Sequence, residues 1–110
     1  MTSPTARSLA LLRKEDWTAQ VVERFNQYAM VRVDLFGCID IVAIKTGNPG
    51  VLGIQATSTG NISAREKKIL ALPTTQIWVK AGNSMQIWGW SKKGERGKTK
   101  HWTLTTREIV

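Results

Sequence analysis

The sequence predicts an α/β domain in which a few helices wrap a β-sheet, and three of its features lead to this expectation. Apolar residues recur at helical spacing near the start of the chain and again before position 72. Between these segments lie two runs rich in aliphatic residues, separated by the turn sequence Gly47-Asn-Pro-Gly50. Further strand-like runs follow. Because 110 residues suffice for one hydrophobic core, residues 1–110 should form a single domain.

Two helices are expected before the first strand. The first runs from Pro4 to about Lys14, because Ser3 can cap it and proline suits a first helical turn. The second follows Asp16, which can cap it. Its apolar stripe consists of Trp17, Val21 and Phe25. Glu23 lies near the edge of this stripe, so its carboxylate either points towards the core or is solvated on the helix surface.

Three strands are expected next, and the second and third have the strongest sequence pattern. They cover Met30 to Phe36, Ile39 to Lys45 and Val51 to about Ser58. The first alternates between apolar and polar residues, whereas the other two are rich in aliphatic side chains. Because a tight turn joins the last two, they should pair antiparallel.

The second half of the chain is expected to contain one more helix and further strands. The helix runs from about Ala64 to Leu72, is capped by Asn61 or Ser63, and is ended by Pro73. The strands cover Thr75 to Lys80, Met85 to Trp90 and His101 to Arg107, the last as a strand or an extended tail. A hydrophilic, cationic loop separates the last two strands.

The strong positive charge of the chain favours a polyanionic partner. Sixteen Lys and Arg residues against eight acidic ones give a formal net charge of +8. Nucleic acid is the commonest polyanionic partner of a small basic domain, and charge does not distinguish DNA from RNA. The alternative is a merely solvated positive surface. Five cations of the cationic loop should contact backbone phosphates without reading the base sequence: Lys92, Lys93, Arg96, Lys98 and Lys100.

Several classes of protein are disfavoured by composition. No run approaches the ~18 uncharged apolar residues that a membrane helix needs, and the first residues lack the apolar core of a signal peptide. The single cysteine, Cys38, has no partner for an intramolecular disulfide, which fits a reducing cytoplasm. One cysteine with one histidine, His101, excludes a Cys/His zinc site. We therefore expect a cytoplasmic protein that does not act in a membrane.

Polar residues interrupt the two strongest strands where burial should disfavour them. Asp40 lies within a run of Ile and Val, and Gln55 and Thr57 lie within the next run. A buried carboxylate is costly unless it is paired, hydrogen-bonded or bound to a metal. Gln55 and Thr57 share one face of an alternating strand. Oxygen ligands meeting there, with Glu23 reaching in, would suit Mg²⁺, although a buried Asp is often a capping or turn residue.

This arrangement resembles the restriction-endonuclease-like PD-(D/E)XK nuclease superfamily, and most closely its small Holliday-junction-resolvase-like branch. The resemblance extends from about Glu23 to Gly82. The segments that support it are Val22 to Asn26, Asp34 to Ile44, Gly53 to Ser58 and Asn61 to Ile69. It implies an α-β-β-β-α-β core with a mixed central sheet and a C-terminal β extension. It also implies that Asp40 binds a metal ion, as the strand aspartate of the family does.

The second strand departs from the family pattern. Glu-x-Lys in the family supplies a second metal ligand and a lysine that positions water, but here these places hold Gln55 and Thr57. Glutamine can ligate Mg²⁺ through its carbonyl oxygen without contributing charge, and threonine supplies no cation. A cation from the following helix could replace the lysine: Arg65, Lys67 or Lys68. Glu23 would be the helix carboxylate that some members use, and Asp34 is either a further ligand or a hydrogen-bonding hairpin residue.

The resemblance implies a Mg²⁺-dependent or Mn²⁺-dependent endonuclease that hydrolyses DNA, with branched or junction DNA as its substrate. The catalytic set would be Glu23, Asp40, Gln55 and Thr57, and the metal ligands Asp40, Gln55 and Glu23. The phosphate-binding set would be Arg65, Lys67 and Lys68 together with the cationic loop. Resolvase-like nucleases usually act as dimers, so a homodimer is implied. A phage or mobile-element origin would suit so small a nuclease.

Two other interpretations stay open at this point. One is a nucleic-acid-binding protein on the same fold, whose catalysis is weak or lost because of Gln55 and Thr57. The other is a small β-barrel that binds nucleic acid by stacking bases on its tryptophans. The tryptophans in question are Trp78, Trp88, Trp90 and Trp102, which are otherwise core or edge-strand residues. A helix at residues 64–72 packed on a sheet would exclude the barrel.

Overall fold

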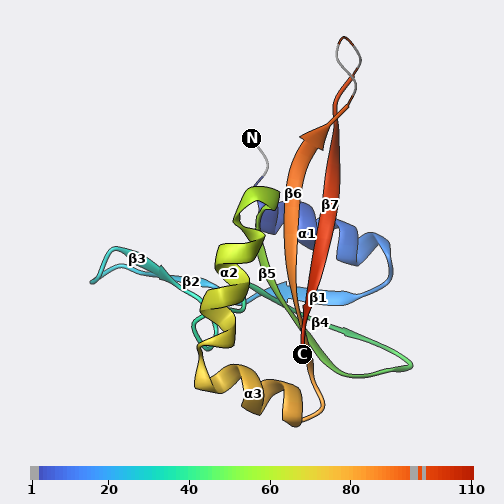
Figure 1. The fold of residues 1–110 in the computed structure, drawn as a ribbon. Helices are drawn as coiled ribbons and strands as arrows, with labels where there is room; N and C mark the ends of the chain where they lie inside the picture. Colours follow the sequence, from blue (N-terminus) through green and yellow to red (C-terminus); the bar gives the residue numbers. More distant parts are fainter. Residues whose placement is uncertain (1–2, 95–96, 98) are drawn as a thin grey trace.

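The computed structural model describes residues 3–94, 97 and 99–110, and it shows an α/β fold built on a mixed five-stranded sheet (Figure 1). The helices of this described part are α1 (Pro4–Lys14), α2 (Ile62–Leu70) and α3 (Pro73–Lys80), and a short 3-10 helix, η1 (Thr59–Asn61), precedes α2. The strands are β1 (Thr18–Val21), β2 (Arg24–Asn26), β3 (Val31–Val33), β4 (Ile41–Lys45), β5 (Asn48–Ser58), β6 (Ser84–Lys93) and β7 (His101–Ile109).

The strands of the main sheet lie in the order β1-β4-β5-β6-β7. β4 pairs antiparallel with both β1 and β5, and β6 pairs antiparallel with β7. β5 and β6 are parallel, so a crossover must connect them, and α2 and α3 form it. β4 and β5 are joined by a two-residue turn, in which Gly47 has a φ of 85° that favours glycine.

Helices cover both faces of this sheet and create two hydrophobic clusters. On one face Leu12 of α1 packs with Ile41 and Ile54. On the other face Ile69 of α2 packs with Ile39 and Ile87. β5 contributes Leu52 and Ile54 to the first cluster only, and because successive side chains of a strand point to opposite faces, Gln55 and Thr57 point away from it. The three layers therefore leave the polar residues of β5 on the face that α2 covers.

Gly89 of β6 sets how closely the start of α2 approaches the sheet. A Cβ at this position would lie 2.9 Å from the Cα of Thr59 and 2.5 Å from Cδ1 of Ile62. Real Cβ atoms do not come this close to other atoms, so only glycine fits without moving η1 and α2. Because Gly89 has no side chain, η1 and the start of α2 can lie this close to β6.

β2 and β3 form a separate two-stranded hairpin that projects from the sheet (Figure 1). Several large apolar side chains of this hairpin are exposed: Phe25, Tyr28, Met30, Val31 and Val33. The predicted strand from Met30 to Phe36 is correspondingly shorter than expected. Met30 and Phe36 have φ values of 56° and 54°, which interrupt an extended strand at both of its ends.

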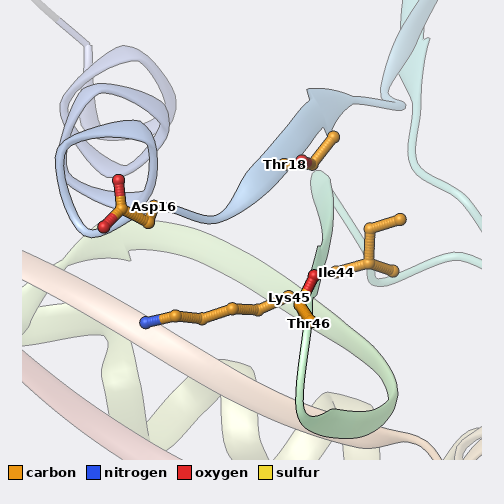
Figure 2. A pocket seen from close by; sticks show the side chains of 5 residues that line it. All are labelled: Asp16, Thr18, Ile44, Lys45 and Thr46. Carbon is orange, nitrogen blue, oxygen red and sulfur yellow. The ribbon is translucent and has the colours of Figure 1, made fainter.

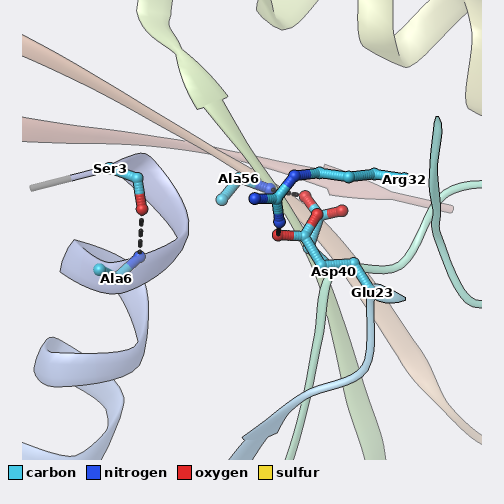
Figure 3. A network of polar contacts seen from close by, with 6 residues as sticks. All are labelled: Ser3, Ala6, Glu23, Arg32, Asp40 and Ala56. Atoms are coloured by element: carbon cyan, nitrogen blue, oxygen red, sulfur yellow. Dashed lines mark hydrogen bonds and ion pairs between the residues drawn. The ribbon is translucent and has the colours of Figure 1, made fainter. Parts of the chain in front are cut away.

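Most of the predicted elements are confirmed. The first helix has the expected bounds, and the Oγ of Ser3 accepts a hydrogen bond of 3.1 Å from the backbone N–H of Ala6 (Figure 3). The two strands around Asp40 and Gln55 pair antiparallel as expected. The helix predicted at residues 64–72 and the two C-terminal strands are also present. An α/β fold with a mixed sheet is therefore established.

The second helix predicted after Asp16 is wrong. This segment instead forms β1 and then β2, and Thr18 to Val21 pair with Ile44 to Ile41 of β4. The chain turns sharply at Asp16, whose φ is 67°, and this turn aligns the next residues with the open edge of β4. Tertiary pairing overrides the helical spacing of apolar residues here, and Phe25, part of that stripe, is exposed.

The strand predicted from Thr75 to Lys80 is also wrong, because these residues belong to α3. Pro73 does not only end the preceding helix but occupies the first turn of the next one. The Thr75 hydroxyl donates a hydrogen bond of 2.7 Å to the Ile69 carbonyl, which joins the two helices. The Trp78 indole N–H donates to the Ser84 carbonyl at 2.7 Å, which ties α3 to β6.

The barrel interpretation is excluded by the open sheet and by the helix that packs on it. α2 contributes Ile62 and Ile69 to the cluster formed with β6. Among the residues described, no helix has the length and apolar character required to cross a membrane.

Candidate metal site

A cavity of about 290 Å³ lies where β1 ends and β4 begins, and acidic side chains converge on it. Its lining residues come from α1, α2, β3, β5 and the connecting segments. They are Thr5, Glu23, Arg32, Asp34, Asp40, Gln55, Ala56, Arg65 and Lys68. Three carboxylates from the segments beside the sheet and two cations from α2 therefore line the same cavity.

Backbone hydrogen bonds hold the acidic residues beside one another. The N–H groups of Val22 and Glu23 donate to the Asp40 carbonyl at 2.8 and 3.4 Å. The Asp40 N–H in turn donates to the Ile54 carbonyl of β5 at 2.8 Å. The Leu35 N–H donates to the Ile39 carbonyl at 2.9 Å, which closes a short loop and returns the chain to Asp40 beside Asp34. Four segments are thus fixed around one point.

Three carboxylates meet at this point and could hold a metal ion. One ligand atom from each of Glu23, Asp34 and Asp40 lies within 4.8 Å of the other two. Asp40 is the most buried of them, with 4% of its surface exposed. Its Oδ2 accepts a hydrogen bond of 2.9 Å from the Ala56 N–H (Figure 3). Carboxylate oxygens grouped this closely are the ligands that Mg²⁺ and Mn²⁺ prefer.

Burial, together with the neighbouring acids, raises the pKa of Asp40 from its ordinary value of 3.8 to about 8. Burial is the largest cause, followed by a hydrogen bond with Asp34 and the negative charges of Asp34 and Glu23. The hydrogen bond from Ala56 opposes this shift. Without a cation, Asp40 therefore holds a proton near neutral pH and forms a hydrogen bond with Asp34. A bound cation would favour the ionised carboxylate and release that proton.

Gln55 adds an unused oxygen to the carboxylate cluster. Its side chain is 2% exposed, and its Nε2 donates to Asp34 Oδ2 at 3.4 Å. Within the described part of the chain, its buried Oε1 accepts no hydrogen bond. Buried acceptors are rarely left without a partner, so this oxygen marks a place where a ligand would complete the site.

Arg32 is a cavity residue that the sequence analysis did not identify. Its Nη1 lies 3.3 Å from Glu23 Oε1, and Figure 3 shows its guanidinium directed towards Glu23 with Asp40 beside them. The Arg32 side chain is 70% exposed, whereas that of Glu23 is 14% exposed. Nothing in the Val31-Arg32-Val33 pattern could have shown this contact, because it depends on the pairing of β2 with β3, which sets Arg32 opposite Phe25 and close to Glu23.

The structure brings together most, but not all, of the predicted site residues. Glu23, Asp40 and Gln55 meet at the cavity, although Glu23 lies between two strands and not on a helix as expected. Asp34 joins them. Thr57 is buried but does not line the cavity, so its predicted catalytic role lacks a geometric basis.

The predicted phosphate-binding residues fall into two groups. Arg65 and Lys68 line the cavity, whereas Lys67 is exposed on α2 and does not. Lys92 and Lys93 lie at the end of β6, and Lys100 directly precedes β7. Arg96 and Lys98 lie outside the described residues.

A second hollow of about 300 Å³ lies beside the turn between β4 and β5 (Figure 2). Its charged lining residues are Asp16 and Lys45, and the Lys45 ammonium already donates to the Glu15 carbonyl at 3.0 Å. A single exposed carboxylate and an engaged lysine do not form a cation site. The acidic cavity is therefore the better candidate for function.

The chain was also compared with known proteins, and no family model, curated protein or solved structure matches it.

Proposed function

We propose that the protein is a metal-dependent endonuclease that hydrolyses phosphodiester bonds of DNA, with branched or junction DNA as its substrate. One observation carries this proposal: three carboxylates and Gln55, whose Oε1 has no partner among the described residues, line the same cavity as two cations of α2. An acidic cluster alone would suit many ions. Acids and cations that line one cavity of about 290 Å³ suit an ion together with a phosphate group.

The residues present fit a Mg²⁺ or Mn²⁺ ion. Glu23, Asp34 and Asp40 would hold it through carboxylate oxygens, and Gln55 would add its carbonyl oxygen. Such an ion, when bound, activates water and stabilises the charge that develops on the phosphate. The high pKa of Asp40 is consistent with a site whose negative charge needs a cation for balance.

Cations of the chain would hold the phosphate of the substrate. Arg65 and Lys68 of α2 line the cavity, and neither is part of the ion pairs found among the described residues. Arg65 can donate to two oxygens of one phosphate, and Lys68 can contact an adjacent one. These residues would replace the lysine that the family carries at the position of Thr57. Arg32 would move from Glu23 to the phosphate when an ion occupies the carboxylates.

The order of elements in the main sheet supports the resemblance to restriction-endonuclease-like proteins. Along the chain this order is α1, three strands (β1, β4 and β5), a helical crossover and β6, with β7 as an extension. We interpret this order as the α-β-β-β-α-β core, with α1 and β1 in the places expected for the helix of Glu23 and the strand at residues 30–36. The β2–β3 hairpin is then an insertion in this core.

The second candidate function is nucleic-acid binding without turnover. The observation that favours it is the position of Thr57, because no cation of β5 can reach the acids. If Arg65 and Lys68 bind phosphate but do not assist catalysis, the protein would bind a junction and leave it intact.

Removal of the α2 cations tests the proposed role of the cavity. Arg65→Gln and Lys68→Gln should each slow cleavage of a four-way DNA junction in Mg²⁺ or Mn²⁺ by about tenfold or more, because each removes charge stabilisation at the phosphate. Lys67→Gln removes the same charge from the same helix outside the cavity and should change the rate little. Gel analysis of labelled junctions measures the rates.

Failure of the unmodified protein to cleave junction or linear DNA in either metal would contradict the nuclease proposal. Equal effects of the three substitutions would show that only the overall charge of α2 matters.

A homodimer is proposed on the basis of the β2–β3 hairpin. Phe25 is 55% exposed, Met30 73% and Val31 50%, and grouped exposed apolar side chains mark interaction surfaces. A second copy of the chain would cover them, as the resemblance to dimeric resolvases implies. Light scattering should give the mass of two chains, and Phe25→Asp should shift this to one. A single-chain mass for the unmodified protein at micromolar concentration would contradict the dimer.

A further inference from the structure

The β6–β7 hairpin continues beyond the main sheet as a two-stranded arm. The last residue of β5 that pairs with β6 is Ser58, opposite Trp90. β6 and β7 remain paired further along, as far as Lys93 and His101. Figure 1 shows this arm rising past the end of the sheet. The arm therefore presents side chains that no third strand flanks.

Two cations gather around one aromatic ring at the base of this arm. The Arg7 guanidinium carbon, from α1, lies 3.7 Å from the centroid of the Trp102 ring. The Lys92 ammonium lies 5.5 Å from the same centroid, and Lys92 is the residue opposite Trp102 in the strand register. The Trp102 residue stays 40% exposed. A flat ring is thus held in place by cations while part of it faces solvent.

Within the described part of the chain, no side-chain hydrogen bond uses the donors of Arg7 or Lys92. Arg7 Nε is buried and has no acceptor there, so contact with a ligand would fall to the other guanidinium nitrogens. The two ion pairs found there, Arg32–Glu23 and Arg107–Glu66, include neither Arg7 nor Lys92. Free donors beside an exposed indole suit a ligand that combines negative charge with flat rings.

The other tryptophans of the C-terminal half serve the fold. The Trp78 indole N–H donates to the Ser84 carbonyl, and that of Trp90 donates to Ser8 Oγ at 2.9 Å. Trp88 is 7% exposed and belongs to the core cluster under α1. Of the four tryptophans considered in the sequence as stacking platforms, Trp102 has the accessible ring.

We propose that Arg7, Lys92 and Trp102 form a binding site for an unpaired stretch of nucleic acid. A base stacks on the part of the Trp102 ring that Arg7 leaves accessible, and Arg7 and Lys92 contact the adjoining phosphates. Bases of an intact duplex are already stacked on both faces, so the indole selects unpaired ones. A polyanion without bases would use the cations but not the ring.

The site formed by Arg7, Lys92 and Trp102 would bind a part of the DNA that lies next to the part held in the acidic cavity. Thr5 lines that cavity, and Arg7 follows it two residues later in the same helix. Residues two apart lie on different faces of a helix, so a strand that leaves the cavity would pass around the start of α1 to reach the arm. This part of the inference rests on the proposed nuclease function, and it specifies DNA with an unpaired segment next to the cleaved bond.

Binding of labelled oligothymidylate in EDTA tests the site without a contribution from metal. Trp102→Leu should weaken binding by about fivefold or more, the loss expected for one stacked base. It should leave the affinity for inorganic polyphosphate unchanged, whereas Arg7→Gln and Lys92→Gln should weaken binding of both ligands. Lys45→Gln is the matched control, because Lys45 lies 5.6 Å from the Trp17 ring on another hairpin. Fluorescence anisotropy and competition measure these affinities.

Two results would overturn the inference: equal effects of Trp102→Leu and Lys45→Gln on oligothymidylate, or an equal loss of polyphosphate and oligothymidylate binding in Trp102→Leu. The second would indicate a site for polyanions in general. Circular dichroism verifies that each variant is folded. Because Lys92 is exposed, Lys92→Gln tests the site without disturbing the packing of the core.

The test of this binding site and the test of the proposed nuclease function can fail independently of each other. If the unmodified protein cleaves junctions but Trp102→Leu binds oligothymidylate normally, this inference alone is wrong. If Trp102 proves necessary for binding and no cleavage occurs in any metal, the binding site stands and the nuclease proposal fails.

Discussion

Asp40→Asn is expected to reduce DNA cleavage by at least about 100-fold and to weaken Mn²⁺ binding to a similar degree. Asp40 is the most buried of the three carboxylates, and its backbone ties β1 to β5. Asparagine keeps an oxygen for the Ala56 N–H and can donate to Asp34, as the protonated carboxyl does. The variant should therefore fold while lacking one negative ligand. Calorimetric titration with Mn²⁺ and junction cleavage measure the two losses.

The same variant has a distinct signature in the pH dependence of stability. The pKa of Asp40 is about 8 in the folded protein against an ordinary 3.8, so the folded state holds a proton that the unfolded state loses as pH rises. The metal-free protein should lose stability between about pH 4 and pH 8, by at most about 1.4 kcal/mol per pH unit for one proton. Asp40→Asn should remove this dependence, and urea unfolding at several pH values measures it.

Asp16→Asn is the matched control for both measurements. Asp16 is exposed and has a φ of 67°, a conformation that asparagine tolerates equally well. It should leave cleavage, metal binding and the pH profile unchanged. Full cleavage by Asp40→Asn would contradict the assignment of this cavity as the active site. An unchanged pH profile would contradict the protonation of Asp40.

Gln55→Glu is expected to have opposite effects on the metal-free and metal-bound protein. Glutamate would place a fourth carboxylate beside Glu23, Asp34 and Asp40, and it would lose the Nε2 hydrogen bond to Asp34. The metal-free variant should therefore be less stable. With an ion present, the added charge should raise Mn²⁺ affinity by about tenfold or more and increase the rate of cleavage.

Thermal unfolding with and without Mn²⁺ measures this reversal directly. Gln20→Glu makes the same change at an exposed position of β1 and should show neither effect. A Gln55→Glu variant that binds Mn²⁺ no more tightly than the unmodified protein would show that Gln55 does not face the ion.

The residues at the centre of the site could be predicted because they break a strong local pattern. Ile39 to Lys45 and Val51 to Ser58 are aliphatic runs joined by a turn, so their pairing follows from local sequence. A carboxylate and an amide within such runs must lie close together and be buried. Asp40 and Gln55 were identified on this basis, and the structure places both at one cavity.

The rest of the site depends on contacts between segments far apart in the chain. Glu23 was expected on a helix because apolar residues recur at helical spacing around it, but pairing with the edge of β4 decides its conformation. Arg32 reaches the cavity because the register of β2 with β3 sets it opposite Phe25 and close to Glu23. The short apolar run of α3 fits a helix and a strand equally, and packing on β6 determines which forms.

Gly89 has a consequence for how this protein can vary. The distance between the acids of the sheet and the cations of α2 is set by the approach of η1 and α2 to β6, which requires a residue without a side chain. None of the residues that line the cavity takes part in that contact. Substitutions in the cavity can therefore change its charge and ligands while the spacing of its walls is preserved. The residues that line the cavity can therefore vary more freely than Gly89, which does not line it but must stay glycine for α2 to keep its position.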